Sequence, residues 1–88
     1  MMALAPHRAR ELRDLVALID ERRVAKCDGR LVLAELTDRF AARHRFAHGA
    51  YELRIAGVTS TSTAGAAGLL TNWQAAARRR LAKDRDHA

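Results

Sequence analysis

The stretch YELRIAGV, residues 51–58, decides between an all-helical domain and one that also contains β-structure. Its apolar residues at 51, 53 and 55 alternate with charged residues at 52 and 54, which is the two-residue period of a half-buried strand. A helical turn over residues 51–56 is the alternative, because only one aromatic and one β-branched residue fall inside that segment. We expect the strand, and therefore an α+β domain that is mostly helical.

Two antiparallel amphipathic helices are predicted before this stretch. Residues 7–26 carry one apolar stripe at helical spacing, formed by Leu12, Leu15, Val16 and Ile19. In the turn that follows, Asp28 can cap the second helix or Gly29 can end the first. Residues 30–44 then place Leu36 and Phe40 on a second apolar face.

One long C-terminal helix is predicted after the stretch, anchored in the core by Trp73. It opens at Ser62 or Thr63 and carries apolar residues at helical spacing as far as Leu81. Glycines 65 and 68 each weaken its first turns by about 1 kcal/mol relative to alanine, so we expect close backbone approach there. The whole chain, residues 1–88, is expected to form one domain with frayed ends at 1–6 and 83–88.

Composition points away from enzymes and membranes. The chain of 88 residues is too short for a second domain, and no nucleophile, base and orienting group stand out, so we expect no catalysis. His44 and His48 could share a helix face, but a third metal ligand is missing, so no metal or cofactor is predicted. The single cysteine, Cys27, excludes an intrachain disulfide and suits a reducing, cytoplasmic location. The uncharged stretch 56–77 is too rich in hydroxyl and amide side chains to span a membrane.

Two features favour an anionic partner on a chain whose net charge is +6. The first is a run of hydroxyl side chains at a predicted helix start, where free backbone N–H groups bind phosphate. The second is a basic cluster at the end of the same helix, suited to nucleic-acid phosphates. The candidate binding residues are Thr59, Ser60, Thr61, Ser62, Thr63, Arg78, Arg79, Arg80 and Lys83. The alternatives are a solvated loop that caps its own turns and cations that compensate the helix dipole.

Residues 55–59, Ile-Ala-Gly-Val-Thr, resemble the turn of bacterial helix-turn-helix repressors, in which a glycine precedes a Ser/Thr-rich recognition helix. The likeness extends over residues 53–73. It departs from that pattern at Leu53, where a small residue is usual, and at Thr63, where an apolar one is usual. It therefore assigns no family.

These observations predict a small, non-enzymatic nucleic-acid-binding or regulatory protein. The alternative is a helical protein–protein interaction module whose Leu- and Ala-rich faces form the contact, with no nucleic-acid role. Because a lone strand must pair with something, we also expect a homodimer through strand pairing of Tyr51–Ile55.

Overall fold

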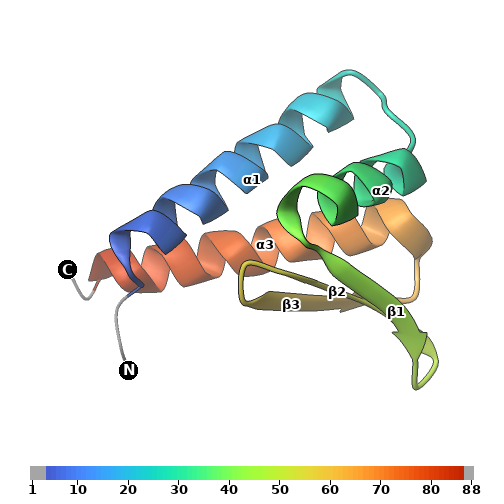
Figure 1. Cartoon of the computed structure of the whole chain (residues 1–88). Helices are drawn as coiled ribbons and strands as arrows, with labels where there is room; N and C mark the ends of the chain where they lie inside the picture. The colour runs from blue at the N-terminus through green and yellow to red at the C-terminus, as the bar shows by residue number, and fades with distance from the viewer. Residues whose placement is uncertain (1–3, 87–88) are drawn as a thin grey trace.

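The computed structural model describes residues 4–86 and contains three helices and three strands (Figure 1). In chain order they are α1 (Pro6–Val24), α2 (Gly29–Phe40), β1 (Arg43–Ala47), β2 (Ala50–Ile55), β3 (Val58–Ser62) and α3 (Gly65–Asp86). The prediction of a mostly helical α+β domain is confirmed. The number of strands differs from the prediction, because two further strands flank the expected one between α2 and α3.

The strands form one antiparallel sheet in the order β1-β2-β3, so β2 lies at its centre. Both hairpins turn through two residues with positive φ: His48 (54°) and Gly49 (78°), then Ala56 (53°) and Gly57 (80°). Positive φ at both central residues is the type I′ geometry, which matches the twist of paired strands and favours glycine. The turn at 56–57 therefore joins two strands, so the local sequence likeness to a helix-turn-helix does not extend to the structure.

Helix α3 packs against one face of the sheet and joins it to α1 and α2 (Figure 1). Trp73 is fully buried at this contact, and its Nε1 donates a hydrogen bond to the Val58 carbonyl at 3.0 Å. Leu53 and Ile55 of β2 point to the same side and are buried with it. The prediction that Trp73 anchors the core is confirmed.

A buried amide joins α1 to α3. The side chain of Gln74 is only 1% exposed, and its Nε2 donates to the Val16 carbonyl at 3.0 Å and to Asp20 Oδ1 at 2.8 Å. Its Oε1 accepts from Arg23. A buried amide costs little when its polar atoms are paired, so this contact fixes how the two helices lie together.

A surface ion network holds the first two helices together. Arg22 Nε and Nη2 donate to the two carboxylate oxygens of Glu35 at 3.0 and 2.9 Å, and Arg39 Nη1 donates to Glu35 Oε2 at 2.9 Å. The hydrogen bonds from Arg22, with those from Arg39, lower the pKa of Glu35 to about 2. At the entry to α2, Asp28 accepts from the Arg30 N–H at 2.8 Å, so Asp28 caps the second helix.

Several helix ends differ from the sequence prediction. Helix α2 stops at Phe40 because Ala41 adopts the left-handed conformation, and the chain then enters β1. Helix α3 begins at Gly65 and continues to Asp86, so it includes residues 83–86, which the sequence prediction left out of the helix. The Leu4 N–H donates to Asp84 Oδ1 at 2.6 Å, which ties the start of the described chain to α3. Residues 1–3 and 87–88 of the predicted frayed ends lie outside the described residues.

The close approach expected at both glycines of α3 occurs at Gly68 but not at Gly65, where an added Cβ would meet nothing within 4 Å. A Cβ at Gly68 would lie 2.8 Å from Ser62 Oγ and 2.9 Å from the Ala64 Cβ, closer than side chains tolerate. This glycine lets the segment that leaves β3 run against the first turns of α3.

None of the helices in the described residues combines the length and the apolar content that a membrane-spanning helix needs.

Candidate nucleic-acid interface

The hydroxyl run of residues 59–63 is a strand and its exit, not the start of a helix. Residues 59–62 belong to β3, and α3 begins only at Gly65. The helix start predicted at Ser62 or Thr63 is therefore wrong, which removes the reason to expect a phosphate site on a helix N-terminus at this run. Serine and threonine hydroxyls suit β3 because it is an edge strand with one buried and one exposed face.

Strand alternation divides this run between two sides of the sheet. Ser60 and Ser62 point inward and are each only 8% exposed. Ser60 Oγ donates to the Leu69 carbonyl at 3.3 Å, and Ser62 Oγ accepts from the Ala64 N–H at 2.9 Å. Thr59 and Thr61 point outward and are exposed. Only the outward hydroxyls are available to a partner.

The outward side chains of all three strands form a polar surface, which we call the outer face. It consists of Arg43 and Arg45 of β1, Glu52 and Arg54 of β2, and Thr59 and Thr61 of β3. These side chains lie opposite the face that α3 covers, and all are exposed except Glu52, which is half-buried. Arg45 Nε lies 3.2 Å from Glu52 Oε1. Three arginines against one glutamate make this face basic.

Two arginines of the outer face stand directly opposite each other. Arg43 and Arg54 are paired residues of β1 and β2, and neither has an ion-pair partner among the described residues. Like charges in this position destabilise a sheet. Both side chains also line a hollow of about 340 Å³ together with Arg8 and Glu11 of α1, which form an ion pair at 3.3 Å. Cations from α1, β1 and β2 therefore converge at this end of the sheet.

The basic cluster predicted at residues 78–83 lies elsewhere. Arg78 Nη2 donates to Asp20 Oδ2 of α1 at 2.9 Å, so this side chain lies on the α1 side of α3, away from the outer face. Arg79, Arg80 and Lys83 are exposed on the C-terminal half of α3. The structure thus gives two separate basic regions, and it does not bring Arg78 together with Arg43, Arg45 and Arg54.

Two other predictions lose their geometric basis. His44 lies in β1 and His48 in the following turn, so they do not share a helix face. The strand Tyr51–Ile55 is central in the sheet, with β1 on one side and β3 on the other. Its partners are thus strands of the same chain, which removes the reason to expect a homodimer through this strand.

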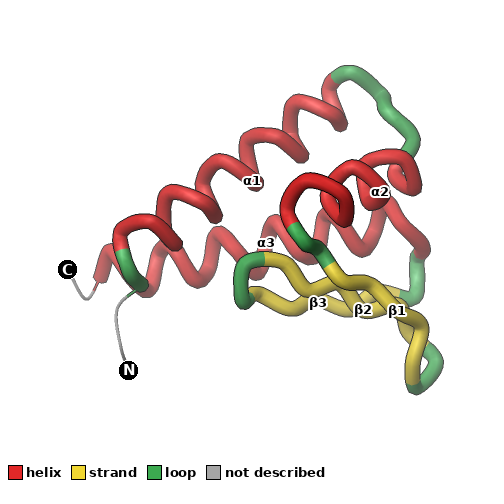
Figure 2. The backbone as a smooth tube through the Cα atoms, viewed as in Figure 1, coloured by secondary structure: helices red, strands yellow, loops and turns green. Residues whose placement is uncertain are grey.

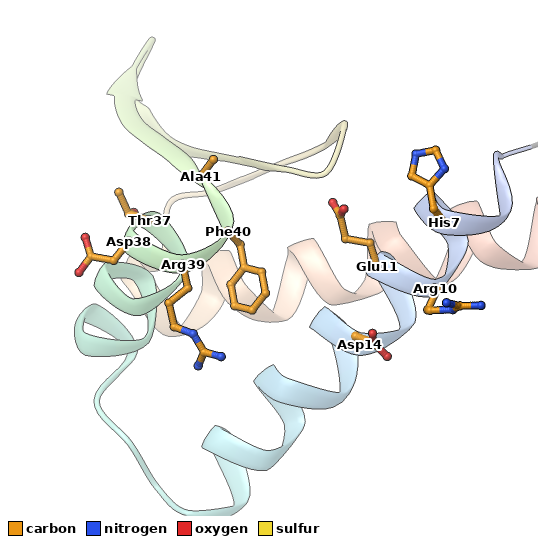
Figure 3. Close-up of a pocket in the computed structure, with 9 residues that line it drawn as sticks. All are labelled: His7, Arg10, Glu11, Asp14, Thr37, Asp38, Arg39, Phe40 and Ala41. Atoms are coloured by element: carbon orange, nitrogen blue, oxygen red, sulfur yellow. The ribbon is translucent and has the colours of Figure 1, made fainter.

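A cleft of about 640 Å³ opens between the N-terminal half of α1 and the C-terminal end of α2 (Figure 3). Its charged lining is mixed: Arg10, Glu11 and Asp14 come from α1, and Asp38 and Arg39 from α2. The Arg39 guanidinium lies 5.2 Å from the centre of the Phe40 ring. Such a balanced lining favours neither an anionic nor a cationic ligand.

Sequence reasoning missed β1, and it did not include Arg43, Arg45 or Arg54 among the candidate binding residues. Both faces of β1 are exposed along most of its length, so its sequence RHRFA has no apolar alternation. The signal that could have revealed it is a pair of X-Gly steps, at 48–49 and 56–57, with the strand-like residues 50–55 between them. Two such steps predict two consecutive hairpins.

Comparison of the chain with protein-family models, with curated proteins and with solved structures found no match.

Proposed function

We propose that this protein is a small, non-enzymatic nucleic-acid-binding protein that holds a phosphate backbone on the outer face of its sheet. The observation that carries the proposal is the pair Arg43 and Arg54, opposed on neighbouring strands with no carboxylate partner among the described residues. Such an arrangement costs free energy in the isolated protein, and a bound anion would offset that cost.

The surroundings of this pair suit a sugar–phosphate backbone. Arg45 and the hydroxyls of Thr59 and Thr61 lie on the same face, and side chains of these types donate hydrogen bonds to phosphate. A hollow of about 520 Å³ runs beside Arg43, Arg45 and Arg54. The outer face carries no aromatic side chain, so this part of the surface would position a backbone without reading bases.

The test compares two double variants that each remove two positive charges. Arg43→Gln with Arg54→Gln changes the outer face, and Arg79→Gln with Arg80→Gln changes the C-terminal half of α3. Affinity for labelled oligonucleotides is measured by fluorescence anisotropy between about 50 and 200 mM salt. We expect the first variant to bind more weakly and to lower the slope of log affinity against log salt by about 1.4–1.8, the value of two phosphate contacts. The second should stay close to the parent protein.

The opposite result would be equally informative. A larger loss in the Arg79/Arg80 variant would place the interface on the C-terminal helix, as the sequence predicted. No measurable binding of the parent protein to either single-stranded or duplex DNA at about 50 mM salt would remove the proposal.

A second proposal is a helical module that binds another protein. It is favoured by two exposed apolar side chains that flank the connection between α1 and α2, Val24 at 84% and Leu31 at 70% exposure. A pocket of about 310 Å³ lies at the same end, lined by Ile19, Val32 and Leu70 among others. Exposed apolar groups next to a pocket are typical of protein contacts. This surface is distinct from the outer face, so the charge variants above would leave it unchanged.

A further inference from the structure

The hairpin of β1 and β2 carries an exposed aromatic pair. Phe46 and Tyr51 are opposed residues of the two strands, and their rings meet edge to face with centroids 5.0 Å apart. Phe46 is 64% exposed and Tyr51 43%. Large aromatic side chains this accessible on a small domain mark an interaction surface.

The position of the pair explains why the fold leaves it open. Tyr51 alternates with the buried Leu53 and Ile55, so it belongs to the face that packs on α3. Its partner on the other side is Ser62, the last residue of β3, after which the chain turns into α3. The hairpin continues past this point and projects away from the helices (Figures 1 and 2). The rings therefore lie beyond the part of the sheet that α3 covers.

The charge of the same strand disfavours a second copy as the partner. Strand β1 contains Arg43, His44 and Arg45 and no acidic residue. Antiparallel pairing of two β1 strands about Arg45 would set the arginines of one copy near those of the other, and like charges opposite each other are destabilising. An anionic partner is favoured instead.

The placement of rings and cations selects the type of nucleic acid. Successive residues of a strand point to opposite faces, so Arg45 and Phe46 lie on the two sides of one edge strand. A ligand that contacts both must bend sharply around β1. A single strand can do this and can offer an unstacked base to an aromatic ring. A duplex is stiff over about 150 base pairs and keeps its base faces stacked inside.

We infer that the ligand is a single-stranded nucleic acid, which lays its backbone on the outer face and stacks a base on the Phe46–Tyr51 pair. This inference rests on the proposed function and adds the class of nucleic acid and the base contact. Base–aromatic stacking tolerates any sequence, because every base has a π-face. The predicted binding is therefore strong for unstructured strands and weakly dependent on sequence.

The first experiment uses the fact that Tyr51 is the only tyrosine of the chain. Protein labelled with 3-fluorotyrosine has one fluorine resonance, which we expect to shift on addition of an oligothymidylate of about 12 nucleotides. A duplex of the same length should shift it much less at equal concentration. A resonance that moves equally with the duplex, or that moves with neither ligand, would overturn the inference.

The second experiment separates ring stacking from ordinary apolar contact. Phe46→Leu and Tyr51→Leu keep an apolar side chain but lose the ring, so each should weaken oligothymidylate binding about tenfold while leaving the salt slope unchanged. Tyr51→Phe keeps the ring and is the matched control, expected to bind like the parent. Circular dichroism confirms that the variants are folded.

Backbone binding on the outer face and base stacking on the Phe46–Tyr51 pair are distinguished by different outcomes of these experiments. If the leucine variants bind like the parent while Arg43→Gln with Arg54→Gln binds weakly, the stacking inference is wrong and backbone binding on the outer face stands. If the parent binds neither the single strand nor the duplex, both proposals are wrong.

Discussion

The two edge strands of the sheet, β3 and β1, flank the same central strand, yet α3 packs against β3 and leaves β1 exposed. Strand β3 has three buried residues, and the Ser60 hydroxyl donates a hydrogen bond to the Leu69 carbonyl of α3. Two side chains of α3 donate hydrogen bonds to carbonyls of β3. Trp73 Nε1 donates to the Val58 carbonyl, and Asn72 Nδ2 donates to the Thr61 carbonyl at 2.8 Å. Strand β1 has no buried residue.

The contrast between β3 and β1 indicates where binding residues can lie. Side chains of β3 that face α3 are occupied by the fold, so only its outward threonines can serve a ligand. Nearly every side chain of β1 is accessible, and its aromatic and cationic residues do not hold the core together. Substitutions should therefore affect stability in β3 and its contacts with α3, and binding in β1.

The largest effect should come from the residue that joins β3 to α3. Trp73→Ala removes a fully buried ring and its hydrogen bond to the Val58 carbonyl, so we expect a loss of about 3–5 kcal/mol in the free energy of unfolding. The matched change in β1, Phe46→Ala, should cost less than about 1 kcal/mol. Urea unfolding followed by far-ultraviolet circular dichroism measures both. Equal losses would mean that β1 also belongs to the core.

The next effect separates the two sides of β3. Ser60→Asp places a carboxylate on the buried face without a partner, and we expect a loss of about 2–3 kcal/mol in unfolding free energy. Thr59→Asp lies on the outer face opposite Arg54 and should change it by less than about 1 kcal/mol. Thermal unfolding of the two variants side by side tests the assignment. A Thr59→Asp variant that is the less stable of the two would contradict this alternation.

The smallest expected effect on stability comes from the ion network of Glu35 with Arg22 and Arg39, which links α1 to α2. Helix α2 is the helix that leads into β1. The pKa of Glu35 is lowered to about 2 by Arg22 and Arg39, so the carboxylate stabilises the folded state above its ordinary pKa of 4.5. That contribution is lost as the pH falls from about 4.5 towards 2, because the unfolded state then binds the proton more readily. We expect it to be about 1 kcal/mol, since the network lies at the surface.

Unfolding midpoints between pH 7 and pH 3 measure this contribution. The matched variant Glu35→Gln should be less stable than the parent at pH 7, and the difference should narrow in acid. A constant difference across this range would show that the charge of Glu35 is not the cause.

Local patterns in the sequence were sufficient for the elements whose residues repeat with one period. The apolar stripes of α1 and α2, the alternation of residues 51–55 and the role of Trp73 follow from periodicity, because each of these segments buries one face. The close approach at Gly68 was also predictable, since a glycine inside a helix costs free energy that some contact must justify.

The surroundings of the hydroxyl run and of the basic residues depend on tertiary packing and not on local sequence. Thr59 and Ser60 are neighbours of similar chemistry, and only the packing of α3 on one side of β3 makes one exposed and the other buried. Arg43 and Arg54 are eleven residues apart and meet because the tight turn at residues 48 and 49 folds β2 back along β1. A charge cluster built across strands depends on register, and register depends on turns and core packing that no local period of β1 reveals.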